Sequence, residues 1–135
     1  MNIAATHPAL RALSVRQPFA SLIISGRKTI ELRTWRTHYR GPVLIIASAK
    51  PWAGDHDHLM GPMGVTIGLV EVVDCREFDP KMDWSSTCIP KTHQLPAKPH
   101  YSWVLANPRP VRQVPCKGML NLFQPSHNLL EYLFG

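Results

Sequence analysis

The sequence predicts a mainly β domain with short helices, an α+β fold in which the strands form a small barrel. Two observations favour this fold. Several short apolar segments are separated by turns, and 13 prolines against 8 glycines favour turns over long helices. The length of 135 residues fits one hydrophobic core, which we place in residues 11–135, with residues 1–10 as a flexible N-terminus.

The segment 11–26 predicts a short strand followed by a helix of about two turns. Pro18 suits the first helical turn because no N–H is needed there, and Gly26 is placed for a left-handed stop at the end of the helix. Ile30 and Leu32 then alternate with polar residues. This alternation predicts a strand with one charged face.

The later segments predict most of the sheet. The continuous apolar run 42–50 is typical of a strand buried on both faces at the centre of a sheet, and 65–75 predicts a second strong strand. Residues 76–99 are rich in proline and have little periodicity, which predicts a long excursion over the surface. Two short strands in 100–118, then a strand and a short apolar helix in 119–134, complete the chain.

The net charge of +6 is unevenly distributed. Residues 1–50 hold eight basic side chains and one acidic side chain, Glu31, whereas residues 51–135 hold seven basic and eight acidic side chains. A net +7 in the first segment predicts an anionic partner. Nucleic acid is the commonest such partner; an acidic protein, an anionic lipid, or a solvated face with no ligand are the alternatives.

Nothing in the sequence indicates export or insertion into a membrane. The N-terminus lacks a signal-peptide pattern, and no apolar run approaches the roughly 18 residues of a membrane span. Three cysteines at wide spacings suit reduced thiols better than disulfides. We therefore expect a cytoplasmic monomer.

Several motifs in a fixed order resemble the ASCH family, named for homology to activating signal cointegrator. They are LSVRQPFASLIISGRKTIELRTW, YRGPVLIIASAK, IGLVEVVDC, WVLANPRPV and PCKGMLNLF, between about Leu13 and Phe123. The resemblance implies a β-barrel related to the pseudouridine synthase and archaeosine transglycosylase (PUA) RNA-binding domain, with a helix beside a basic cleft. It also implies binding of RNA or another nucleic acid. Some small relatives look like hydrolases of N4-acetylcytidine, and ribonuclease activity is associated with others.

The family's motif residues fall on specific positions of this chain. Its Gln-Pro-aromatic turn matches Gln17 and the two residues after it, and its acid and arginine match Glu31 and Arg33. Lys28 matches the catalytic lysine of the acetylcytidine hydrolases, which carry a Thr nucleophile at the position of Glu31. Many relatives also have Asn at the position of Leu32. The resemblance therefore favours binding over hydrolysis.

Glu31 has two possible roles. Its carboxylate can accept an N–H from a nucleobase edge while neighbouring cations hold a phosphate, or it can form an internal ion pair with Arg33 or Arg16. In an enzyme, Lys28 would act as the catalytic base, with a pKa lowered by neighbouring cations, and Glu31 as the proton carrier.

Arginine forks, lysine point charges and aromatic rings together suit single-stranded RNA. Trp35 is the strongest candidate for stacking because its strand face is polar, although Trp35 and Trp52 can instead plug the barrel ends. Gln17 can read a base edge or cap the helix. The predicted nucleic-acid-binding residues are Arg16, Gln17, Lys28, Glu31, Arg33, Trp35, Arg36, Tyr39, Arg40, Lys50 and Trp52.

The run from Asp55 to His58 resembles a set of metal ligands, but adjacent residues cannot all point at one ion. We therefore expect neither metal nor cofactor. The sequence predicts a protein that binds RNA or another nucleic acid, single-stranded or modified, in a basic, aromatic-lined cleft. The alternatives are a hydrolase acting on a modified nucleoside or on RNA in the same cleft, and a protein-binding adaptor.

Overall fold

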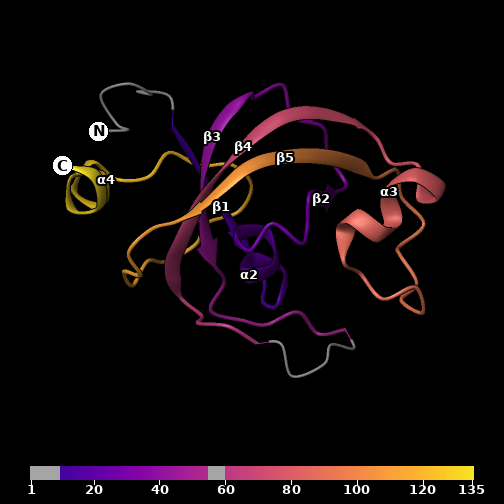
Figure 1. The fold of residues 1–135 in the computed structure, drawn as a ribbon, viewed down its shortest axis with the longest axis horizontal. Helices are drawn as coiled ribbons and strands as arrows, with labels where there is room; N and C mark the ends of the chain where they lie inside the picture. Colours follow the sequence, from indigo (N-terminus) through magenta and orange to yellow (C-terminus); the bar gives the residue numbers. More distant parts are fainter. Residues whose placement is uncertain (1–9, 55–59) are drawn as a thin grey trace.

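A computed structural model describes residues 10–54 and 60–135 as a curled mixed sheet with three short helices (Figure 1). The elements are β1 (Arg11–Val15), α2 (Phe19–Ile24), β2 (Ile30–Arg33), β3 (Gly41–Ala47), β4 (Val65–Glu77), α3 (Pro80–Thr87), β5 (Tyr101–Pro110) and α4 (His127–Phe134). The strand order is β1-β3-β4-β5-β2, with β1 parallel to β3 and the other pairs antiparallel. The mainly β prediction is confirmed as a half-barrel whose edge strands are β1 and β2.

Strand β3 is buried on both faces, as its apolar run predicts. Val43 and Ile45 belong to a core cluster that includes residues of α2, whereas Leu44 and Ile46 belong to a second cluster on the opposite face. This alternation follows from the two-residue period of a strand. The centre of the sheet, however, is β4, which pairs with both β3 and β5.

Helix α2 packs on the inner face and ends where the sequence predicts. Phe19, Ala20 and Ile23 are its buried residues, and they join the first core cluster. Gly26 has a φ of +85°, the left-handed conformation that glycine adopts without steric cost, and its N–H donates to the Ile23 carbonyl at 3.0 Å. This turn leads the chain into β2.

Helix α4 covers the second cluster with its apolar side chains. The N-terminal cap is Ser126, whose Oγ accepts a hydrogen bond from the N–H of Leu129 at 3.2 Å. The expected strand before this helix is reduced to one bridge between Ala12 and Phe123. Figure 1 places α4 and α3 at opposite ends of the molecule.

The stretch 76–99 differs from its prediction because it contains α3. This helix has no apolar periodicity, so hydrophobic pattern alone misses it. Its start is marked instead by Asp79, whose carboxylate accepts the N–H of Lys81 at 3.0 Å, and by Pro80 at the first helical position. The two strands expected in 100–118 are one long strand, β5, followed by a bridge at Pro115.

The helices of the described chain have six to eight residues. None of them is long and apolar enough to cross a bilayer.

Candidate functional site

A pocket of about 660 Å³ lies where the edge strands β1 and β2 face each other. Its walls come from these strands, the loop after α3 and the segment 118–121. Among the residues lining it are Ser14, Arg16, Phe19, Lys28, Glu31, Arg33, Ser48, Trp52, Ile89, His93, Leu95, His100, Met119, Leu120 and Asn121. The volume lies within the range of about 300–1,000 Å³ found for small-molecule sites. It suits a ligand of nucleoside or nucleotide size.

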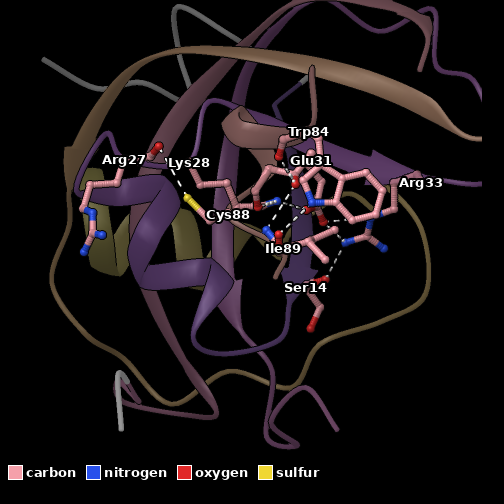
Figure 2. A network of polar contacts seen from close by, with 9 residues as sticks. Ser14, Arg27, Lys28, Glu31, Arg33, Trp84, Cys88 and Ile89 are labelled. Atoms are coloured by element: carbon pink, nitrogen blue, oxygen red, sulfur yellow. Dashed lines mark hydrogen bonds and ion pairs between the residues drawn. The ribbon is translucent and has the colours of Figure 1, made fainter. Parts of the chain in front are cut away.

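The floor of the pocket is an ion network centred on Glu31 (Figure 2). Its Oε1 lies 3.5 Å from Lys28 Nζ. Its Oε2 accepts from Arg33 Nη2 at 2.7 Å and from Arg33 Nε at 3.0 Å. Two cations therefore share one carboxylate, and the network carries a net positive charge when all three groups are ionised.

The network connects three parts of the fold. Lys28 Nζ donates to the carbonyl of Thr87 at the end of α3 at 2.7 Å, and Arg33 Nη2 donates to the carbonyl of Ser14 in β1 at 3.1 Å. Arg33 thus spans the open side of the half-barrel, where β2 and β1 do not pair. The internal ion pair expected as one alternative for Glu31 is present, with Arg33 and not Arg16 as its partner. Direct contact of Glu31 with a ligand stays a prediction.

Burial and neighbouring charges shift the pKa values of Lys28 and Glu31 in opposite directions. Burial lowers the pKa of Lys28 below its ordinary value of 10.5, and the attraction of Glu31 only partly offsets that effect. Burial alone would raise the pKa of Glu31, but the Arg33 guanidinium and the Lys28 ammonium outweigh it and hold the pKa below 4.5. The main cause of the Lys28 shift is therefore desolvation, not the neighbouring cations expected from the sequence.

Aromatic side chains form another wall of the pocket. Trp52 meets Phe19 edge to face, with ring centroids 4.9 Å apart, and meets His93 in the same way at 4.8 Å. Lys28 Nζ lies 4.9 Å from the Phe19 ring centroid. Cationic and aromatic surfaces thus meet at the floor.

Arg16 differs from the floor cations because it is exposed at the pocket and its side chain has no hydrogen-bond or ion-pair partner among the described residues. Its position directly after β1 places the side chain at the mouth. The guanidinium is free to bind an anion that enters from solvent.

Five of the predicted residues meet at this pocket: Arg16, Lys28, Glu31, Arg33 and Trp52. Trp35 lies elsewhere and packs edge to face on Trp103, with ring centroids 4.6 Å apart. Its carbonyl accepts from Trp103 Nε1 at 3.2 Å. A stacking role for Trp35 therefore stays a prediction without support from the pocket.

The remaining predicted residues do not line the pocket. Gln17 is buried, and its amide bonds Ser21 and the carbonyl of Pro62, which is the structural alternative left open by the sequence. Arg36 lies over the Tyr101 ring, and Tyr39 donates to the Pro42 carbonyl. Arg40 donates to the carbonyls of Thr37 and Tyr39. Arg36, Arg40 and Lys50 are exposed.

Sequence reasoning missed the wall formed by the loop after α3 and by the segment 118–121. Ile89, His93, Leu95 and His100 come from a stretch with no periodic pattern, which the structure brings against β2 through the contact of Lys28 with Thr87. Long irregular loops are often functional, and this was the available signal.

No group of three or more His, Cys, Asp or Glu side chains within the described ranges 10–54 and 60–135 has the arrangement of a metal site. The run from Asp55 to His58 lies outside these ranges.

Comparison with known proteins gives consistent results. The ASCH domain model matches residues 13–115. Activating signal cointegrator 1 is 35% identical in human and 32% identical in mouse over 80 aligned residues, covering 47% of this chain but 14% of those relatives. This chain thus matches only a small part of their length.

Solved structures of the ASCH protein from Zymomonas mobilis have the same fold. One structure has a TM-score of 0.69 at 15% identity, and the match covers 92% of this chain and 95% of the Zymomonas mobilis chain. A tyrosine-to-phenylalanine variant of the same protein has a TM-score of 0.71 at 14% identity, and the match covers 92% of this chain and 98% of the variant. With most of its length matched by the family model and its half-barrel shared with these structures, the chain belongs to the ASCH domain family, a PUA-like family associated with nucleic-acid binding.

Proposed function

We propose that this chain binds RNA and holds one unpaired or modified nucleotide in the pocket between β1 and β2. The observation that carries the proposal is that cationic and aromatic side chains share one cavity of about 660 Å³. Arginine binds phosphate through a planar fork of donors, and aromatic rings stack on bases. The pocket offers both kinds of contact within the size of one nucleotide.

The charges of the pocket support an anionic ligand. The pocket is lined by three cationic side chains, Arg16, Lys28 and Arg33, and by one carboxylate, that of Glu31. Because Glu31 is already bound by Lys28 and Arg33, its negative charge is neutralised before a ligand arrives. Arg16 then remains to bind a phosphate at the mouth, while Trp52 lies along the wall for a base.

The shape favours a single strand over a duplex. A cavity that takes one base requires that base to be unstacked, which costs least in single-stranded segments. We therefore place the phosphate toward Arg16 and the base toward Trp52.

The test is a titration of a fluorescently labelled single-stranded RNA oligomer by anisotropy at several salt concentrations. A duplex RNA and a single-stranded DNA of the same sequence serve as comparisons. We expect the RNA strand to bind more tightly than the duplex, with affinity falling as salt rises by a slope of about 0.7 per phosphate contact in a log-log plot. A flat salt response, or tighter binding of the duplex, would contradict the proposal.

A matched pair of aromatic variants locates the binding site. Trp52→Ala should weaken RNA binding by about 1–3 kcal/mol through loss of stacking. Tyr132→Ala removes another accessible aromatic ring, on α4 and outside the pocket, and should leave binding unchanged. Equal effects of the two variants would remove the pocket from the proposal.

Hydrolysis of a modified nucleoside is the second candidate, and the lowered pKa of Lys28 favours it. A general base needs a free lone pair, however, and Lys28 Nζ contacts both the Thr87 carbonyl at 2.7 Å and Glu31 at 3.5 Å. The neighbouring Glu31 carboxylate favours the ammonium form, which has no lone pair until it loses a proton. This arrangement ranks hydrolysis below binding.

Mass spectrometry separates the two candidates. The protein is incubated with N4-acetylcytidine and with an RNA oligomer, without added metal. Unchanged substrates together with oligomer binding support the binding role. Product that disappears in Lys28→Ala would make the pocket a catalytic site and would overturn the ranking.

A further inference from the structure

Two apolar side chains project into solvent at the mouth of the pocket. Met119 is 62% exposed and Leu120 is 91% exposed, yet both also line the cavity. A side chain that does both must stand at the rim, with one face toward the pocket and the rest in water. We call this pair the apolar lip.

The backbone that carries the apolar lip contacts strand β1 on both sides of the lip. Before it, Gly118 lies so close to Ser14 that an added Cβ would fall 2.4 Å from the Ser14 Oγ. After it, Phe123 and Ala12 exchange two backbone hydrogen bonds of 2.7 and 3.0 Å. Asn121, between these anchors, has a left-handed φ of +61°. The segment that carries Met119 and Leu120 is therefore held against β1 at both ends, with the two side chains exposed between them.

An exposed apolar pair at the rim of a cationic pocket suits a nucleobase. A base is flat and mostly apolar on its faces, while its phosphate is anionic, so a strand leaving the pocket presents both kinds of surface in turn. Leu and Met side chains pack against and between bases in other nucleic-acid-binding proteins. The lip lies where the nucleotide next to the bound one would leave the pocket.

We propose that the apolar lip packs against the base of the nucleotide adjacent to the one in the pocket. This inference rests on the proposed function and narrows the ligand: the site takes a strand of two or more nucleotides and not a free nucleoside. Arg16 would then bind the phosphate between the two bases.

The test combines ligand length with a lip variant. Adenosine 5′-monophosphate, the dinucleotide pApA and both abasic versions of that dinucleotide are titrated against the wild type and Leu120→Ala by NMR. The wild type should bind pApA about fivefold tighter than the abasic dinucleotide that lacks the adjacent base, since that base would remove exposed apolar surface of the lip from water. Leu120→Ala should lose most of this preference, because only Met119 of the lip remains, and should bind the mononucleotide as the wild type does.

Met82→Ala is the matched control, because Met82 is 70% exposed on α3 and does not line the pocket. It should retain the fivefold preference. Leu120 is almost fully exposed, so its replacement should leave the fold intact.

Three results would overturn the inference. If Leu120→Ala keeps the preference for pApA, the lip does not contact the adjacent base, although the pocket can still bind one nucleotide. If the wild type binds neither the mononucleotide nor pApA, the proposed function fails and the lip with it. If Leu120→Ala changes only the self-association measured by sedimentation, the lip is a contact between copies of the chain.

Discussion

The cations at the floor of the pocket and the cation at its mouth are used differently. Lys28 and Arg33 share the carboxylate of Glu31 and donate to carbonyls of α3 and β1. The side chain of Arg16, in contrast, is exposed and has no partner in the described part of the chain. All three lie within 18 residues of sequence and line the same cavity. Their roles differ because their exposure differs.

Exposure decides the role through the cost of desolvation. A buried charge is costly unless it is paired, so the buried Lys28 needs Glu31, which the partly buried Arg33 also contacts. An exposed arginine keeps its hydration and requires no partner. The floor should therefore govern stability, and the mouth should govern affinity.

The largest effect should come from removing the floor carboxylate. Glu31→Gln leaves the buried Lys28 and the partly buried Arg33 near each other without a counter-charge. Breaking a buried ion pair from one side costs about 3–5 kcal/mol. We expect the free energy of unfolding in urea to fall by this amount. Glu131→Gln, on the half-exposed carboxylate of α4, should change it by less than about 0.5 kcal/mol. Similar losses in both variants would mean that the network does not brace the fold.

Low pH should weaken the contribution of the Glu31 ion network to the stability of the fold. The pKa of Glu31 is lower in the folded chain than its ordinary value of 4.5, so folding favours the ionised carboxylate. This contribution is complete above pH 4.5 and is lost as the pH falls through the lower pKa of the folded state.

The measurement is urea unfolding from about pH 6 to about pH 2, compared between the wild type and Glu31→Gln. The wild type should lose more stability than the variant below pH 4.5, because other carboxylates titrate in both. Parallel curves would show that Glu31 has no special part in acid stability.

The sequence predicted the floor better than the walls for a physical reason. Lys28, Glu31 and Arg33 lie within six residues of one another, just before and within strand β2, so their proximity is local and visible in the sequence. His93 and Leu120 reach the same cavity only through tertiary contacts, from a loop and a segment that strand pairing brings together. The fold shows the same division. The two-sided burial of β3 follows from its apolar run, whereas α3 has polar faces and is indicated only by its cap.

At the mouth, Arg16→Ala should reduce affinity without affecting the fold. Loss of one charged phosphate contact should weaken RNA binding by about tenfold and lower the salt slope by about 0.7. The free energy of unfolding should stay within about 0.5 kcal/mol of the wild type. Arg36→Ala is the control, because Arg36 is also exposed but lies over the Tyr101 ring, outside the pocket. A salt slope lowered equally by both variants would indicate a diffuse basic surface.

The smallest effect should come from a polar group at the mouth. Asn121 lines the pocket, and its side chain has no hydrogen-bond partner among the described residues, so its amide is available to a base edge. Asn121→Gly removes the amide and keeps the φ of +61° accessible. Affinity for the preferred base should fall about threefold, the value of one ordinary hydrogen bond, while affinities for the other bases change less.

Asn107→Gly is the control for that substitution, because Asn107 has a similar φ of +54° in β5 and does not line the pocket. Its amide donates to Glu71 at 2.9 Å, so the variant removes a comparable hydrogen bond far from the ligand. Titrating four homopolymeric RNA oligomers against each variant gives the comparison. If the affinity differences among the four oligomers become smaller only in Asn121→Gly, Asn121 at the mouth of the pocket contributes to base selection. An unchanged preference would leave Arg16 and the apolar lip to contribute affinity there without selecting a base.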